Sequence, residues 1–294
     1  MAGTAVAAIP FDAPVSIAAS QRPSGVAIGD LNGDGAGDMA VTTDTPDKIS
    51  IYFGDGAGGF GAPVSVFTGA GTGPDSVVAA DVDGDGDLDL VVALKNIGVV
   101  RVFVNNGAGG FAPGSSAATG VNPRGLIAAD LDGDGDSDFA VANLDSNTVT
   151  VLRNDGGVLA GSSVATGQEP RAVAAADLDG DGDADLVVTN HDDATLWTFG
   201  NDGTGAFAFG QSIAVCCTLR PTGLATGDLD GDGDADILAT TDDADRGLNF
   251  VSVWLNSSGT FGVQTNFESG GANPASLIVS DLDVDGDLDA VVVN

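Results

Sequence analysis

The nine residues Asp81-Val-Asp83-Gly-Asp85-Gly-Asp87-Leu-Asp89 place a carboxylate at every second position, and the 294-residue chain repeats this pattern six times. The copies begin about 50 residues apart, at Asp30, Asp81, Asp130, Asp177, Asp228 and Asp281. Two unit charges about 4 Å apart repel by roughly 4 kcal/mol at an effective dielectric constant near 20. Crowded oxygen ligands suit a hard divalent cation, and glycine at the sixth position permits the turn that gathers them. The pattern therefore predicts a calcium-binding loop in each repeat.

The charge of the chain is concentrated in these loops. The formal net charge is −34 at pH 7, with 43 acidic and 9 basic residues, and most of the acidic residues belong to the six motifs. Six divalent ions would offset part of this charge, but the remainder still disfavours nucleic acid and anionic membranes as partners. Because the sequence contains no run of 18 apolar residues, we expect no membrane insertion.

The cellular location is predicted from calcium rather than from cysteine. The only cysteines are the adjacent pair Cys216-Cys217, whose disulfide would need a strained ring, so reduced thiols and a vicinal disulfide remain alternatives. Weak acidic loops fill where calcium is plentiful, which favours an extracellular or cell-surface protein. Residues 1–10 do not resemble an intact signal peptide.

Each repeat is predicted to form four short strands. A strand rich in small residues precedes each acidic loop (Val77-Val-Ala-Ala), and a continuous apolar run follows it (Leu90-Val-Val-Ala), as in a strand buried on both faces. A third strand alternates (Val100-Arg-Val-Phe-Val) and is half-exposed. A glycine-rich turn leads to a fourth strand that carries proline, which edge strands tolerate.

Four antiparallel strands per repeat, with the smallest residues innermost, are typical of β-propeller blades. We therefore predict an all-β, six-bladed propeller. One domain would span residues 1–294, with repeats at about 20–69, 70–120, 121–167, 168–218 and 219–270, and a sixth made of residues 271–294 together with residues 1–19.

The predicted closing blade is shared by the two ends of the chain. Phe11 precedes Asp30 by the same spacing as Phe111 precedes Asp130, so residues 11–17 read as a fourth strand that comes before any blade begins. Residues 291–294 read as a second strand. We expect the N-terminal strand to complete this blade, which is short by a strand or irregular; the alternative is a piece of a longer, seven-bladed propeller.

The strand opening Phe60-Gly-Ala-Pro63 and the loop Asp-x-Asp/Asn-x-Asp-Gly-x-x-Asp resemble FG-GAP/VCBS repeats, which form the calcium-binding propellers of integrin α-subunit heads and of many bacterial extracellular proteins. The resemblance covers nearly the whole chain and implies side-chain ligands at loop positions 1, 3, 5 and 9 and a backbone carbonyl at position 7. The implied ligands are Asp30, Asn32, Asp34, Ala36 and Asp38; Asp81, Asp83, Asp85, Asp87 and Asp89; Asp130, Asp132, Asp134, Asp136 and Asp138; Asp177, Asp179, Asp181, Asp183 and Asp185; Asp228, Asp230, Asp232, Asp234 and Asp236; and Asp281, Asp283, Asp285, Asp287 and Asp289.

Two copies depart from this pattern. The first copy has Asn32 at position 3, which implies binding with one charge fewer, and the sixth has Val284 where the others have glycine. About six structural calcium ions are expected. An EF-hand is excluded because the twelfth position is Val or Ala; the alternative to calcium loops is solvated acidic turns.

The face opposite the loops is predicted to carry the ligand site. Four arginines lie at the blade crossings beside prolines, Arg22, Arg124, Arg171 and Arg220, and a ring of guanidinium groups suits a carboxylate or sulfate on a glycan. Alternatively, each arginine pairs with a neighbouring Asp or carbonyl.

Trp197 replaces polar residues of other repeats. It is predicted to be either an exposed stacking surface for sugars or a partly covered edge residue, whereas Trp254 is assigned to packing.

No catalytic constellation is found, and we expect no enzymatic activity. The only histidine, His191, is predicted to be exposed polar surface. We expect a binding or adhesion module for a carbohydrate or protein ligand. The alternatives are a structural subunit that polymerises through its incomplete closing blade, and a non-catalytic propeller of a polysaccharide-active enzyme, which turnover screens would distinguish.

Overall fold

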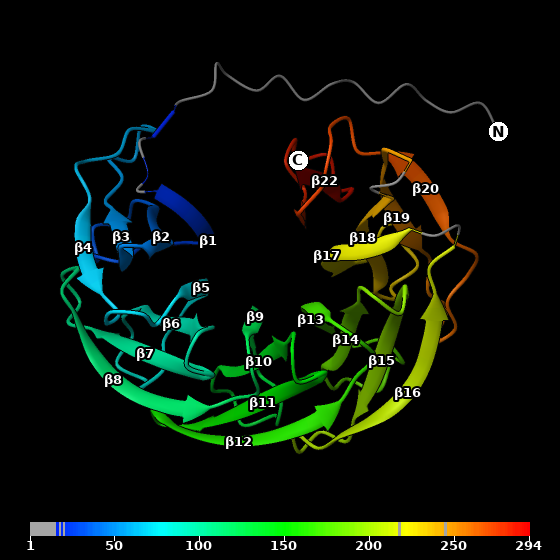
Figure 1. Ribbon diagram of the computed structural model, residues 1–294, viewed down its shortest axis with the longest axis horizontal. Helices are drawn as coiled ribbons and strands as arrows, with labels where there is room; N and C mark the ends of the chain where they lie inside the picture. The colour runs from blue at the N-terminus through cyan, green and yellow to red at the C-terminus, as the bar shows by residue number, and fades with distance from the viewer. Residues whose placement is uncertain (1–15, 18, 20, 217–218, 244–245) are drawn as a thin grey trace.

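The computed structural model describes residues 16–17, 19, 21–216, 219–243 and 246–294. Within this part of the chain, five four-stranded antiparallel sheets and one two-stranded sheet surround a central axis as the blades of a propeller (Figure 1). The strands of the five complete blades are β1 (Gln21–Gly29), β2 (Asp38–Thr45), β3 (Asp47–Tyr52) and β4 (Val64–Phe67); β5 (Pro74–Ala80), β6 (Asp89–Leu94), β7 (Val99–Asn105) and β8 (Phe111–Ala118); β9 (Pro123–Ala129), β10 (Asp138–Asn143), β11 (Thr148–Asp155) and β12 (Val158–Ala165); β13 (Pro170–Ala176), β14 (Asp185–Asn190), β15 (Thr195–Asn201) and β16 (Phe207–Ala214); and β17 (Arg220–Gly227), β18 (Asp236–Asp243), β19 (Leu248–Trp254) and β20 (Thr265–Glu268).

The order of strands within a blade follows the chain. The first strand of each blade lies nearest the axis and the fourth lies on the rim (Figure 1). The second strands are buried along their whole length in blades 2, 3 and 4, as continuous apolar runs predict. The rim strand β8 consists of exposed and half-buried residues. The predicted four-stranded blade is thus confirmed for the five repeats that contain β1 to β20.

The sixth repeat forms a two-stranded sheet of β21 (Ser276–Ser280) and β22 (Asp289–Val293). Figure 1 shows this sheet beside blade 5, on the opposite side of the ring's open interval from blade 1. Most of the predicted closing strand, residues 11–15, lies outside the described residues. The shared closing blade therefore stays a prediction, and the six-bladed ring is seen as five complete blades and a partial one.

The hydrophobic core lies between successive blades rather than inside one sheet. Between blades 2 and 3, Val91 and Val102 of one blade pack against Phe139 and Leu152 of the next. Trp254 is buried between blades 4 and 5, which confirms its assignment to packing. Each of blades 2 to 5 therefore buries one face against the blade before it and the other against the blade after it.

Close approach of the blades at the axis explains why small residues occupy the innermost strands. A side chain at Gly125 of β9 would place its Cβ 2.7 Å from the carbonyl oxygen of Arg171 in β13. No heavy atom fits at that separation, so the backbone of one innermost strand touches the next only because glycine stands there.

Candidate metal loops and an axial cavity

The acidic motifs connect the first and second strands of every blade and of the two-stranded sheet. Each innermost strand has a proline at its start or within two residues of it, and each ends at an acidic loop. Since a strand rises about 3.3 Å per residue, a seven-residue strand separates the proline end from the loop by about 20 Å. The loops and the proline ends therefore lie on opposite faces of the propeller.

The third loop illustrates how the motif folds. The carboxylate of Asp130 accepts hydrogen bonds from the backbone N–H groups of Gly133 (2.8 Å) and Gly135 (3.1 Å), and Asp134 accepts one from Asp136 (2.9 Å). These bonds curl the loop so that oxygens of Asp130, Asp132 and Asp138 lie within 4.8 Å of one another. Similar groups form at Asp81, Asp83 and Asp85; at Asp177, Asp179 and Asp185; and at Asp228, Asp230 and Asp236.

The donor set fits a hard cation. One carboxylate oxygen of Asp132, Oδ1, is buried and has no hydrogen-bond partner, although it lies among other carboxylates. A buried polar atom without a partner costs free energy, and a cation within this cluster would supply the partner. The Asp-rich loops can therefore hold metal ions, and all-oxygen ligands favour calcium or magnesium over a softer metal.

The protonation equilibria of the loops also favour a bound cation. Burial raises the pKa of Asp89, Asp138 and Asp185, although backbone N–H donors act in the opposite direction. In the fifth and sixth loops, desolvation and repulsion by neighbouring carboxylates raise the pKa of Asp230 and Asp283. A cation would oppose these upward shifts, because it stabilises the ionised carboxylate.

The ninth carboxylate of each motif has a second, structural role. Asp138 is fully buried, and it accepts hydrogen bonds from the N–H of Leu131 in its own loop (3.0 Å) and from the N–H of Asn154 at the end of the third strand (2.7 Å). The same pair of bonds is formed in each of the five complete blades, by Asp38, Asp89, Asp138, Asp185 and Asp236. Position 9 therefore ties the loop to the third strand of its own blade.

A series of asparagines, which the sequence analysis missed, joins the third strand of each of blades 2 to 5 to the acidic loop of the preceding blade. The side-chain amide of Asn154 donates to the carbonyl oxygen of Val82, in the loop of the blade before it (2.9 Å). Equivalent bonds run from Asn105 to Leu31, from Asn201 to Leu131 and from Asn256 to Leu178. We call these four residues the asparagine clasps. Their recurrence two positions after a large apolar residue of the third strand was the available sequence signal.

Blade 1 differs from the other blades at this position. Gly54 replaces the clasp asparagine, and a Cβ atom there would overlap the carbonyl oxygen of Gly37. Its backbone N–H still donates to Asp38 (2.8 Å), so the tie within the blade is retained. Blade 1 therefore has no side chain with which to clasp a preceding blade at this position.

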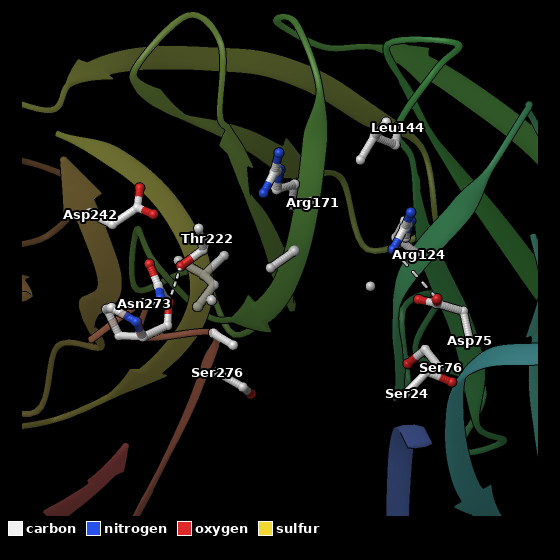
Figure 2. A pocket seen from close by; sticks show the side chains of 16 residues that line it. Ser24, Asp75, Ser76, Arg124, Leu144, Arg171, Thr222, Asp242, Asn273 and Ser276 are labelled. Carbon is white, nitrogen blue, oxygen red and sulfur yellow. Dashed lines mark hydrogen bonds and ion pairs between the residues drawn. The ribbon is translucent and has the colours of Figure 1, made fainter. Parts of the chain in front are cut away.

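The proline ends of the innermost strands surround a cavity of about 510 Å³ on the propeller axis. The residue that follows each proline lines it in all six repeats: Ser24, Asp75, Arg124, Arg171, Thr222 and Ala275. Figure 2 shows Arg171 between Asp242 on one side and Arg124 with Asp75 on the other. The cavity therefore combines two guanidinium groups with carboxylates and hydroxyl groups.

The arginines in the cavity are only partly paired. Arg124 Nη1 lies 3.5 Å from Asp75 Oδ1 of the neighbouring blade, and Arg171 Nη2 lies 3.2 Å from Glu169 Oε2. Arg171 Nε is buried and has no hydrogen-bond partner. More than a third of each arginine side chain is exposed, so guanidinium donors remain available to an anionic group that enters the cavity.

The other two predicted arginines lie elsewhere. Arg22 and Arg220 precede their prolines and do not line the cavity; their side chains lie near Asp44 (3.7 Å) and Asp192 (3.2 Å). The structure thus brings two of the four predicted arginines into one site; both directly follow a proline, the position that lines the cavity in all six repeats.

His191 is buried with 8% of its surface exposed, so the expectation of an exposed histidine is wrong. Its Nδ1 lies 3.1 Å from Asp192 and 3.6 Å from Glu169, and burial, followed by the charge of Arg171, lowers its pKa. With Arg171 and Arg220 beside the same carboxylates, this group joins the proline ends of blades 4 and 5 through ion pairs.

Trp197 is half-buried and packs on the core cluster between blades 3 and 4, with the exposed Phe209 at a ring-centroid distance of 4.9 Å. The two alternatives for Cys216-Cys217, reduced thiols or a vicinal disulfide, both stay predictions, because Cys217 lies outside the described residues. Within the described part of the chain, no helix is long and apolar enough to cross a membrane.

Comparison with known proteins identifies repeats and a fold. A family model described as FG-GAP-like repeat matches residues 30–92, 86–141, 130–188 and 177–239. No curated protein matches the sequence. Among solved structures, a protein from Lactobacillus plantarum is 16% identical with a TM-score of 0.67 (95% of this chain, 79% of that chain). BBS1N in complex with ARL6DN is 14% identical with a TM-score of 0.65 (96% and 79%). Virginiamycin B lyase from Staphylococcus aureus is 14% identical with a TM-score of 0.58 (87% and 73%). At these identities, the likeness concerns the fold alone.

Proposed function

The chain belongs to the FG-GAP-like repeat family, and we propose that it is a calcium-stabilised extracellular propeller that serves as a binding or adhesion module. The six acidic loops would bind calcium as structural ions. In each loop, several carboxylates are exposed to solvent, and backbone N–H groups donate to carboxylate oxygens, as they do to Asp130. Loops of this kind would bind calcium at the concentrations found outside cells. This supports the extracellular assignment.

The axial cavity is the ligand site of this proposal, and the pair Arg124 and Arg171 is the observation that carries it. On a strongly acidic protein, two adjacent guanidinium groups at one cavity mark the place where an anion is attracted rather than repelled. Hydroxyl groups of Ser24 and Thr222 line the same cavity and suit the hydroxyl groups of a sugar. We therefore propose an acidic carbohydrate, with a carboxylate or sulfate group, as the ligand class.

Isothermal titration with uronate and sulfated oligosaccharides, at saturating calcium, tests this assignment. We expect Arg124→Ala and Arg171→Ala each to weaken binding at least about tenfold, since each removes a charge-assisted hydrogen bond. Arg153→Ala is the matched control, because Arg153 is exposed on β11 and lies outside the cavity. Equal binding by all three variants, or the absence of binding by the unaltered chain, would exclude the axial site.

The two-stranded sheet favours a second candidate function, a structural subunit that self-associates through its closing blade. Edge strands offer unpaired backbone groups to another chain, and a contact between different surfaces of identical subunits would build a fibre rather than a closed ring. Size-exclusion chromatography of the chain without residues 1–18 tests donation of the N-terminal strand. Polymers that persist after this deletion would argue against it.

A further inference from the structure

The axial cavity has two walls of different chemical character. Figure 2 shows Arg124 and Asp75 on one side of the cavity. Asp242 and Asn273 lie on the other side, and Arg171 lies between the two. The cavity volume of about 510 Å³ falls within the range of small-molecule sites, about 300 to 1,000 Å³. A ligand that fills the cavity therefore meets both walls.

The wall with Arg124 belongs to a network of ion pairs. Asp75 Oδ1 lies 3.1 Å from Lys95 Nζ and 3.5 Å from Arg124 Nη1. Asp44 lies 3.5 Å from the same lysine nitrogen and 3.7 Å from Arg22 Nε. Three cations thus share two carboxylates, so this network presents a net positive charge to an anion in the cavity.

The opposite wall carries a carboxylate without a countercharge, that of Asp242 near the end of β18. Arg220 lies opposite Asp242 in the β17–β18 ladder, but its guanidinium pairs with Asp192 of blade 4 (3.2 Å). The next cation along the chain, Arg246, lies 3.7 Å from Asp243. Among the residues that the structure describes, no ion pair or hydrogen bond engages the carboxylate of Asp242.

The equivalent position in the other blades differs from Asp242. This position, the sixth after the last aspartate of the acidic loop, holds Asp44, Lys95, Leu144 and His191 in blades 1 to 4. Asp44 pairs with Lys95 (3.5 Å) and His191 with Asp192 (3.1 Å), and leucine carries no charge. A strongly acidic protein repels a further carboxylate, so the one that stays unpaired at a cavity is a candidate group for contact with a ligand.

Other acceptors lie on the same wall as this carboxylate. The side chain of Asn273 is exposed and contributes an amide oxygen. The hydroxyl group of Thr222 donates to the carbonyl oxygen of Pro274 (2.7 Å), which leaves its oxygen as an acceptor. An ammonium group has three donors and no acceptor, so it complements a wall of this kind.

We propose that the axial cavity selects an acidic carbohydrate that also carries a free amino group, an inference that rests on the proposed function of the cavity. Arg124 and Arg171 bind the carboxylate or sulfate group, and the carboxylate of Asp242 accepts hydrogen bonds from the ammonium group. The ligand is thus recognised by opposite charges on its two sides.

The same two walls discriminate against related sugars. A sugar with acidic groups on both sides would bring one of them to Asp242, and like charges repel. A sugar with a neutral N-acetyl group would leave this carboxylate without a partner and would lose a charge-assisted hydrogen bond. Specificity therefore depends on the amino group, whereas the arginines contribute to the binding of every acidic sugar.

Two disaccharides that differ in one group test the proposal: glucuronate linked to glucosamine, and the same disaccharide with the amine acetylated. Isothermal titration at saturating calcium and at about pH 6 keeps the amine protonated, since amino groups titrate at about pH 8. We expect the form with the free amine to bind at least about tenfold more tightly, because it adds a charge-assisted hydrogen bond.

Asp242→Asn removes the charge and keeps the size of the side chain. It should reduce the difference between the two disaccharides to about twofold or less, and it should not weaken binding of the acetylated form. Asp155→Asn is the matched control, because Asp155 is exposed at the end of β11 and lies outside the cavity, so this variant should keep the full preference for the amine. Circular dichroism confirms that each variant is folded before titration.

The titrations separate this inference from the proposed function. If Arg124→Ala weakens binding of both disaccharides, but the unaltered protein binds them equally or Asp242→Asn keeps the preference for the amine, the role of Asp242 is wrong and the cavity still binds acidic carbohydrate. If neither disaccharide binds the unaltered protein, or if Arg124→Ala leaves both affinities unchanged, the ligand site itself is wrong and both proposals are overturned.

Discussion

The junction between blades 2 and 3 and the two-stranded sheet of β21 and β22, which we call the seam, arise from the same repeat but differ in the interactions that a third strand supplies. At the junction, Asp138 is fully buried and accepts two backbone N–H groups, and Asn154 clasps the preceding loop. At the seam, Asp289 is half-buried and accepts the N–H of Leu282. Since the loop sequences are nearly identical, the difference shows that a blade is completed by its third strand rather than by its acidic loop.

Removal of calcium is expected to have the largest effect on stability, and to loosen the loop at the seam before the loop at the junction between blades 2 and 3. A site filled at 100 times its dissociation constant stabilises the native state by about 2.7 kcal/mol, so chelation by EDTA should lower the melting temperature by about 20 °C or more if all six loops contribute. Calorimetry measures the loss, and hydrogen exchange should increase earlier in loop 281–289 than in loop 130–138. A melting temperature unaffected by EDTA would show that the loops hold no structural ions.

The Asn154→Ala substitution should break the clasp at the junction. It leaves the buried carbonyl group of Val82 without its donor and removes the acceptor for the N–H of Gly157. We expect a loss of about 2–3 kcal/mol in the free energy of unfolding by urea. Asn106→Ala is the control: Asn106 is exposed and bonds only within its turn in the described structure, so its loss should stay below about 1 kcal/mol. Equal losses of unfolding free energy in the two variants would show that the asparagine clasp does not stabilise the junction.

Asp138→Asn and Asp289→Asn compare the ninth loop position in the two regions directly. In EDTA, Asp138→Asn replaces a carboxylate oxygen that accepts a buried N–H by an amide group, and the cost should be about 2 kcal/mol. Asp289→Asn loses less, about 1 kcal/mol, because its surroundings are open to water. Chemical denaturation of both variants gives the difference; a reversed order would contradict the structural account of the seam.

The smallest expected effect is at Val284, in the sixth loop. This β-branched residue has φ = 61°, whereas the other five loops place glycine at the same position with φ of 76° to 84°. Val284→Gly should relieve the left-handed strain and raise stability by about 1 kcal/mol. Val263→Gly, at another exposed valine, should not stabilise. A neutral Val284→Gly would indicate that the loop tolerates the strained backbone without cost.

The sequence predicted the repeated parts of this protein well. The acidic loops, the four strands of blades 1 to 5, the buried second strand and the innermost position of small residues all follow from patterns shorter than ten residues. The asparagine clasps escaped this reasoning because Asn154 and its acceptor Val82 are 72 residues apart, and no local pattern distinguishes a clasp from a turn residue. His191 was misplaced for a similar reason, since its burial beside Asp192, which also pairs with Arg220 of blade 5, is not visible in the local sequence.

The sequence by itself determined the repeating unit, a loop of alternating carboxylates between two strands, which occurs six times. This unit can be predicted because side-chain periodicity and charge spacing involve residues that are only a few positions apart. What only the tertiary structure decided is how units depend on their neighbours. It turned Arg124 and Arg171 toward the axis and Arg22 and Arg220 away from it, and it made the ninth aspartate a buried tie in the complete blades. Burial depends on which surfaces meet, and in a propeller each surface is covered by the adjacent repeat.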